Sequence, residues 1–117
     1  MNPAPIKPEI DLSLLEKIDI RAGTILEVSN VSGSDKLCKL TVDFGDHQRS
    51  ILAGIQKERE DPTEIVGLQA LFIVNLPKRK MAGEMSEGML FDIGYADGVL
   101  PVLSVTEKPV PNGSRAG

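Results

Sequence analysis

Apolar and polar residues alternate in several short segments of this chain, and this pattern restricts the fold more than any other feature. In one segment every second residue is apolar, at Cys38, Leu40, Val42 and Phe44. The positions between them are polar, at Lys39, Thr41 and Asp43. Because successive side chains of a β-strand point to opposite faces, residues 37–44 are predicted to form a strand with one buried face. Cys38 is then expected to be a buried thiol rather than a nucleophile.

Similar alternation predicts further strands at residues 18–28 and 89–93. The turns Gly45-Asp46 and Asp97-Gly98 precede expected strands at residues 48–53 and 99–103, and an apolar run predicts one more at residues 70–76. In the first of these segments the apolar side comprises Ile18, Ile20, Ala22, Leu26 and Val28. Gly23 interrupts this segment, which predicts a bulge or a sharp bend. The segment 70–76 is apolar except for Asn75 and is the best candidate for a fully buried strand.

Two short helices are expected between or before these strands. After the third strand, Asp61 is positioned to cap one helical turn, Glu64 to complete a capping box, and Gly67 to end it. Near the N-terminus, Asp11 is expected to cap a helix through residues 14–17 that covers the core as a lid.

These elements predict an all-β domain, a five-stranded Greek-key OB-fold barrel with a short helix between strands three and four and short terminal extensions. An SH3-like barrel or a small sandwich would show many of the same signals. With 117 residues the chain fits one domain. We expect an extended lead-in over residues 1–11, the barrel over residues 12–105, and a loosely held tail over residues 106–117.

Residue types that support catalysis or metal binding are scarce. The only cysteine and the only histidine, Cys38 and His47, leave no intrachain disulfide and no zinc-type cluster. Because His47 is expected in a turn, a serine triad is improbable. We therefore expect no enzymatic activity, no cofactor and no metal. The sequence shows no signal peptide and no bilayer-spanning apolar run, so we expect a cytoplasmic protein with no membrane partner.

Three successive cations, Lys78, Arg79 and Lys80, follow the expected buried strand in a chain of net charge −4. A run of this kind is often only a solvated turn. Here other cations accompany it on the second and third strands and before the helix, at Lys36, Lys39, Arg49, Lys57 and Arg59. On a closed barrel these side chains could form one footprint for phosphates. With three Phe, one Tyr and no Trp, stacking of bases on aromatic rings cannot be the main binding mode.

Neighbouring residues allow both a binding role and a structural role. Asn75 could contact a ligand or cap the loop that follows it. Ser86 could donate to a phosphate or a ribose hydroxyl, or satisfy a backbone group in its own loop. Met81, Met85 and Met89 could be core filler or an adaptable surface for unstacked bases.

Several ordered motifs resemble a known family. They are Leu15–Gly23, Gly33–Leu37, Gly54-Ile55, Asn75–Met81 and Ser86–Met89. They resemble the tRNA-binding domain found at the C-terminus of many methionyl-tRNA synthetases and in endothelial-monocyte-activating-polypeptide-like proteins. The resemblance implies an OB-fold that binds tRNA by shape and backbone, as a free-standing homodimer, with a separate methionyl-tRNA synthetase as a further candidate partner.

The resemblance also implies RNA contacts at matching positions, namely Lys36, Arg49, Asn75, Arg79, Lys80, Met85 and Ser86, with Lys39 and Lys78 as further candidates. The segment Val74-Asn75-Leu76-Pro77 is similar to CsaA-type members, which implies an alternative role as a chaperone-like dimer that binds unfolded or exported polypeptides. The homodimer is supported by apolar residues near both ends that we expect a small barrel to leave uncovered, such as Leu12, Leu14, Val99, Leu100 and Val102.

Overall fold

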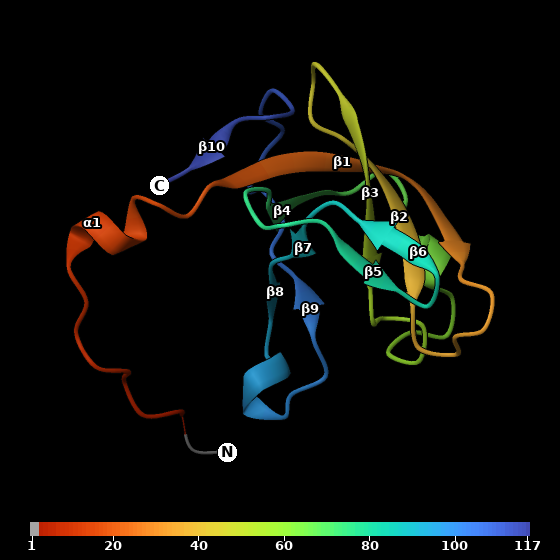
Figure 1. Cartoon of the computed structure of the whole chain (residues 1–117), viewed down its shortest axis with the longest axis horizontal. Helices are drawn as coiled ribbons and strands as arrows, with labels where there is room; N and C mark the ends of the chain where they lie inside the picture. Colours follow the sequence, from red (N-terminus) through yellow and green to blue (C-terminus); the bar gives the residue numbers. More distant parts are fainter. Residues whose placement is uncertain (1–2) are drawn as a thin grey trace.

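The computed structural model describes residues 3–117 and consists mostly of short β-strands (Figure 1). The strands are β1 (Ile20–Asn30), β2 (Cys38–Asp43), β3 (Gln48–Ala53), β4 (Gln69–Ile73), β5 (Arg79–Met81), β6 (Glu84–Ser86), β7 (Met89–Leu90), β8 (Asp92–Ile93), β9 (Val102–Leu103) and β10 (Arg115–Ala116). The helical segments are α1 (Leu12–Leu15) and the 3-10 turns η1 (Pro62–Ile65) and η2 (Tyr95–Asp97).

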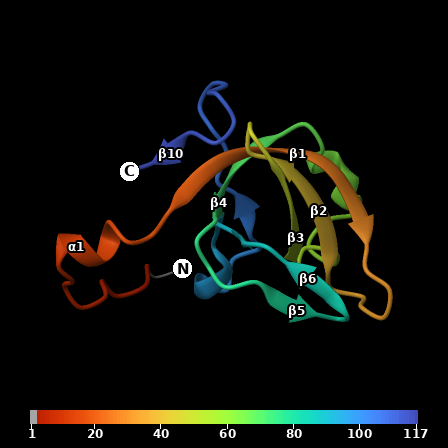
Figure 2. The ribbon, with the colours of Figure 1, turned by 45° about the horizontal axis from the view of Figure 1, so that its top comes forward.

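The main antiparallel sheet follows the order β3-β2-β1-β4-β7, with β10 as a sixth strand paired to β1, and it curls into a half-barrel (Figure 2). The long strand β1 makes this possible, because its first half pairs with β4 and its second half pairs with β2. The strands β5 and β6 form a separate hairpin, and β8 pairs with β9. The mostly β, OB-fold-like architecture expected from the alternation is confirmed, with η1 between β3 and β4 as predicted.

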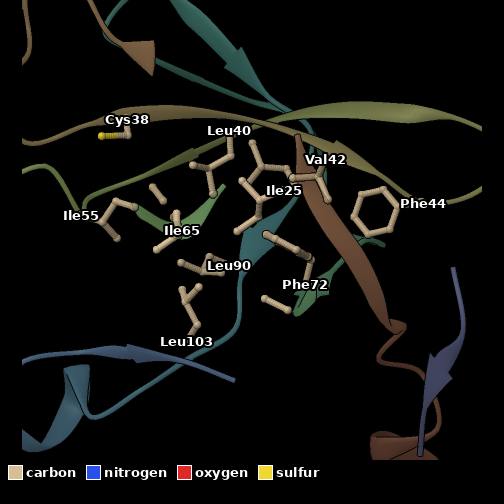
Figure 3. Packing of buried hydrophobic residues seen from close by; sticks show 13 residues of the cluster. Ile25, Cys38, Leu40, Val42, Phe44, Ile55, Ile65, Phe72, Leu90 and Leu103 are labelled. Carbon is tan, nitrogen blue, oxygen red and sulfur yellow. The ribbon is translucent and has the colours of Figure 1, made fainter. Parts of the chain in front are cut away.

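The buried face of β2 supplies the centre of the core, and its predicted alternation is confirmed (Figure 3). Leu40, Val42 and Cys38 are fully buried, and the thiol of Cys38 donates a hydrogen bond to Oε1 of Gln56 at 2.8 Å. Burial raises the pKa of this thiol, which keeps it inert. The ring of Phe72 from β4 meets the ring of Phe44 edge-on at 5.7 Å.

In β1 the predicted bulge at Gly23 was wrong in position. Gly23 pairs regularly with Ala70, whereas the register shifts between Ile25 and Glu27. This shift explains why Leu26 is exposed instead of buried as predicted. Gly23 has a different role. An added Cβ would lie 2.6 Å from Cγ1 of Val42, so only glycine allows the Val42 side chain of β2 to pack against this point of β1.

Of the two predicted N-terminal caps, at Asp61 and at Asp11, only the cap at Asp61 was correct. Oδ1 of Asp61 accepts a hydrogen bond from the amide of Thr63, which confirms the predicted cap of η1. The capping box was wrong, because the carboxylate of Glu64 pairs with Arg59 at 3.4 Å. At the N-terminus the side chain of Asp11 makes no capping hydrogen bond.

The helix α1 is not a lid on the core, as we expected, because none of its residues is buried. It lies on an extended arm that stands away from the half-barrel (Figures 1 and 2). The arm therefore leaves its apolar side chains exposed, at Ile6, Ile10, Leu12, Leu14, Leu15 and Ile18.

The C-terminal tail, predicted to be loose, is attached to the barrel. Strand β10 pairs with the start of β1, and the side chain of Asn112 accepts hydrogen bonds from Thr24 and Gln69. The predicted bounds of two strands were also wrong. The strand expected at 70–76 ends at Ile73, and within the segment 99–103 only Val102 and Leu103 form a strand. These misplaced boundaries depend on distant partners.

Candidate nucleic-acid interface

The basic run lies on a β-hairpin rather than in the loop that the sequence suggested. In β5 and β6, Arg79 pairs with Ser86 and Lys80 pairs with Met85. Ala82 and Gly83 connect the strands with φ angles of +49° and +83°. Two successive residues with positive φ are the signature of the tight turn whose twist suits a two-stranded hairpin. The cations therefore project from a hydrogen-bonded base.

The two faces of the hairpin differ. Lys80 and Met85 lie directly opposite each other, so they share the face that points to solvent, and both are exposed. Ser86 lies on the other face and is only 3% exposed. Within the described residues, no hydrogen bond or ion pair engages the side chain of Arg79 or of Lys80. These two cations are free to bind an anion.

The other candidate lysines differ in whether their ammonium groups form an ion pair. The ammonium group of Lys78 lies 3.8 Å from Oε2 of Glu87, a long contact for a side chain that is two-thirds exposed. Lys39 on β2 forms a 3.2 Å ion pair with Glu84 on β6, which joins the hairpin to the sheet. Lys36 is exposed in the loop before β2.

Arg49 was expected to contribute to a footprint for phosphates, but its side chain is half-buried and hydrogen-bonded to three separate segments. Its Nη1 donates hydrogen bonds to the carbonyl oxygens of Val74 at 2.7 Å and Glu87 at 3.0 Å. Its Nε donates to Nε2 of His47, and the guanidinium lies 5.9 Å from the centre of the Phe44 ring. The guanidinium thus fixes the two ends of the segment that carries the basic hairpin.

Asn75 and Ser86 are also hydrogen-bonded within the protein. Oδ1 of Asn75 accepts from the amide of Asp19 at 2.9 Å, and its Nδ2 donates to the carbonyl of Lys17. The hydroxyl of Ser86 accepts from the amide of Leu52 and donates to the carbonyl of Gly88, both at 3.0 Å. Both side chains take the structural role left open above, although Asn75 caps the segment before β1 and not the loop after it.

A cavity of about 630 Å³ lies beneath the hairpin. Its walls are mainly apolar, from Leu37, Leu52, Ile55, Met81, Met89 and Leu90. Lys78 and Arg79 also line it, together with two carboxylates, Glu58 and Asp92. The sequence did not point to these carboxylates, because Glu58 lies just before the predicted helix and Asp92 lies in an expected strand. No local signal could have found the cavity, since segments far apart in the chain enclose it.

Charged side chains at the start of β1 form ion pairs with one another and with β10. Hydrogen bonds from Arg21 hold the pKa of Asp19 below its usual value, and Arg115 of β10 adds a contact at 3.3 Å. Residues 3–117 contain no grouping of three or more His, Cys, Asp or Glu side chains suited to a metal ion. None of the helices in that range is long and apolar enough to cross a membrane.

Comparisons with known proteins agree with this arrangement. Residues 20–115 match a family model described as "Putative tRNA binding domain". A methionine–tRNA ligase of Porphyromonas gingivalis is 43% identical over 108 residues, which cover 92% of this chain. The chain spans only 16% of the length of that ligase.

Solved structures show the same fold. The crystal structure of a MetRS related protein from Pyrococcus horikoshii superposes with a TM-score of 0.86 at 32% identity, covering 95% of this chain and all of the other. The chaperone CsaA from Bacillus anthracis superposes with a TM-score of 0.81 at 25% identity, covering 94% of this chain and all of that one.

Proposed function

The chain belongs to the tRNA-binding domain family, and we propose that it binds tRNA through the shape and backbone of the RNA, without catalysing a reaction. The observation that carries this proposal is the pair of exposed, unengaged cations Arg79 and Lys80 on a hydrogen-bonded hairpin. Cations fixed on a rigid base can neutralise phosphates although the whole chain is acidic. A tRNA partner implies a cytoplasmic protein.

The nine candidate residues divide into two roles in this proposal. Lys36, Lys78, Arg79 and Lys80 supply charge, and Met85 supplies an exposed apolar contact between them. Arg49, Asn75 and Ser86 hold the backbone of the interface through the hydrogen bonds described above. Lys39 does both when RNA phosphate competes with Glu84 for its ammonium group.

Binding of tRNA over a salt series tests the proposal. Changing Lys78, Arg79 and Lys80 together to Ala should weaken binding at least tenfold at low salt and reduce the slope of log K against log salt by about 2–3, because each of the three lost phosphate contacts no longer releases roughly one counterion. Changing Lys7, Lys17 and Lys108 to Ala is the matched control, since it removes the same charge from the arm and the tail. Equal effects in the two variants would remove the hairpin from the site.

The cavity supports one second candidate, a CsaA-like role in which an extended apolar polypeptide is bound. Its apolar walls, which include Met81 and Met89, can adapt to varied side chains. A competition assay between tRNA and an unfolded peptide separates the two functions. If no peptide is captured at high salt, this second function is rejected.

We also propose that the chain forms a homodimer. We further propose that a separate methionyl-tRNA synthetase uses the tRNA that the chain binds. The dimer is supported by two exposed apolar regions on one protomer, the N-terminal arm and the region around β8 and β9. The second region contains Phe91, Ile93, Val99, Leu100 and Val102. The arm of one protomer and this region of another are complementary in their apolar character.

A further inference from the structure

The only histidine of the chain, His47, lies beside Arg49, whose guanidinium holds the base of the hairpin formed by β5 and β6. Nε of Arg49 donates a hydrogen bond to Nε2 of His47 at 3.0 Å. On the other side of the ring, Nδ1 of His47 lies 2.6 Å from Oδ1 of Asp46. The ring also stacks on Phe44 at 5.6 Å, and the same Phe44 ring lies 5.9 Å from the guanidinium. A hydrogen bond and a shared aromatic surface therefore hold His47 and Arg49 together.

These contacts determine where the histidine ring carries its proton. Arginine stays protonated, so its Nε–H can only donate, and Nε2 of His47 must accept. The hydrogen bond with His47 holds the pKa of Asp46 below its usual value, so this carboxylate is ionised and only accepts. The two contacts together require a neutral ring with its proton on Nδ1.

The hydrogen bond at Nε also sets the direction of the rest of the guanidinium. The group is planar and rigid, so a bond at Nε fixes the plane in which Nη1 lies. Nη1 is then directed at the carbonyl oxygens of Val74 and Glu87, at 2.7 and 3.0 Å. Among the described residues, Nε of Arg49 has no acceptor other than His47. Loss of this acceptor leaves the guanidinium free to turn away from the two carbonyls.

We propose that His47 is a positioning residue for RNA binding. While its ring is neutral it orients Arg49, and through Arg49 it fixes the base of the hairpin that presents Arg79 and Lys80. This inference rests on the proposed tRNA binding and adds a dependence on pH at the same site. A second proton on the ring would occupy Nε2, so the ring could no longer accept from Arg49, and two cations would face each other at 3.0 Å.

The charged groups around the ring act in opposite directions. Asp46 favours the protonated ring, whereas Arg49 on β3 favours the neutral ring. Besides His47, Arg21 on β1 contributes to lowering the pKa of Asp46, so a further cation acts on this turn. Asp43, at the end of β2, accepts a hydrogen bond from the next turn's amide at Gly45. Asp46 can keep its hydrogen bond to Nδ1 in both states of the ring, so the contact to Arg49 is the one that protonation breaks.

Measurement of tRNA binding between about pH 7.5 and about pH 5.5 tests the inference, with His47→Gln as the reference at each pH. Glutamine has an amide oxygen that can accept from Arg49 without titrating. The two chains should bind equally at the higher pH. At the lower pH the native chain should bind about threefold more weakly than the variant, as expected for one partly exposed contact. Protonation beside an RNA site ordinarily strengthens binding by adding positive charge, so the expected effect has the opposite sign.

Two further measurements separate this positioning from a general effect on the fold. His47→Phe keeps a flat ring against Phe44 but has no acceptor. It should bind tRNA about threefold more weakly than the native chain at about pH 7.5, with no further loss in acid relative to His47→Gln. Nitrogen-15 magnetic resonance of the ring needs no assignment, because the chain has one histidine, and it should show the proton on Nδ1 at neutral pH.

A ring that carries its proton on Nε2 at neutral pH would overturn the inference. Equal pH profiles of the native chain and His47→Gln, or relatively tighter binding by the native chain in acid, would do the same. If neither chain binds tRNA at about pH 7.5, the proposed function fails, and hydrogen exchange then decides the role of His47. At about pH 5.5 the amides of β5 and β6 should be less protected in the native chain than in His47→Gln, and equal protection would reject the positioning role.

Discussion

At the scale of a single residue, the hydroxyl of Ser86 satisfies a backbone amide at the edge of the half-barrel sheet. Strand β3 lies at the edge of the sheet, and part of its edge is satisfied by the segment after β6 instead of by a full strand. The hydroxyl of Ser86 accepts from the amide of Leu52, and the amide of Glu87 donates to the carbonyl of Ser50 at 2.8 Å. One hydroxyl therefore replaces a backbone carbonyl at a buried position.

Ser86→Ala should lower the free energy of unfolding by about 1–3 kcal/mol, because the buried amide of Leu52 would lose its acceptor. Urea denaturation followed by circular dichroism measures this change. Ser29→Ala is the control, because Ser29 is exposed on β1 and its change should stay within about 0.5 kcal/mol. Equal stability of the two variants would mean that the hydroxyl does not satisfy this amide.

Asp19 predicts a dependence of stability on acid. Because hydrogen bonds from Arg21 lower the pKa of Asp19 below its ordinary value of 3.8, this carboxylate stabilises the folded state above that pH. Its contribution should be lost as the pH falls below 3.8 and through the lower folded pKa. The loss should be about 1 kcal/mol or less, since the pair is partly exposed.

Thermal unfolding of the native chain and of Asp19→Asn at pH 7 and at acid pH tests this. The variant should be less stable at pH 7, and the difference should shrink at acid pH. A difference that does not change with pH would show that the contribution of Asp19 is independent of its charge.

Residues with local partners could be predicted from the sequence, and residues with distant partners could not. The cap by Asp61 was correct because its partner, Thr63, is two residues away. The amide of Asn75 binds the backbone 56 and 58 residues away, at Asp19 and Lys17. Such a partner exists only after the sheet has formed, so the sequence left the role of Asn75 open.

At the scale of elements, the hairpin of β5 and β6 was missed because its turn is atypical. Hairpin turns with positive φ at both positions favour Asn-Gly or Asp-Gly, whereas this turn is Ala82-Gly83. The flanking sequence is basic and has no clear alternation, so the segment resembled a loop. By contrast, β2 alternates regularly and β3 directly follows a glycine-containing turn, and their predicted extents were correct to within about a residue.

Ala82→Gly should stabilise the protein by about 0.5–1 kcal/mol, because alanine pays a steric cost at a φ angle of +49° that glycine avoids. Chemical denaturation measures this, and tRNA affinity should not fall. Ala96→Gly in η2 is the matched control, and it should destabilise the protein because Ala96 has no positive φ. A loss of stability in Ala82→Gly would contradict the argument.

At the scale of the whole molecule, the position of the N-terminal arm sets how much apolar surface the chain exposes. The arm was expected to cover the core, but the core is already closed by β7, β9 and η1, whose residues Leu90, Leu103 and Ile65 belong to it. The apolar side chains of the arm are therefore left uncovered within the described part of the chain. Periodicity indicates which residues are apolar, but it does not say which molecule covers them.

Sedimentation velocity at micromolar concentration should show a dimer. Changing Leu12 and Leu15 to Asp should convert it to a folded monomer, because these side chains are 67% and 54% exposed and contribute little to the core. Val66→Asp, at an exposed position next to η1, is the control and should leave the dimer intact. A monomeric native chain would refute the proposed dimer.

The hydrogen bonds made by Arg49 have a consequence for the motion of the basic hairpin. Its guanidinium donates hydrogen bonds to the carbonyl oxygens of Val74 and Glu87. These two residues lie at the ends of the segment that runs from the end of β4 to the end of β6 (Figure 2). Because this segment is anchored at its base and paired along its two strands, we expect it to open as one unit. Amide hydrogen exchange within the hairpin should therefore proceed through a local opening that leaves the barrel folded, at a lower free energy than global unfolding.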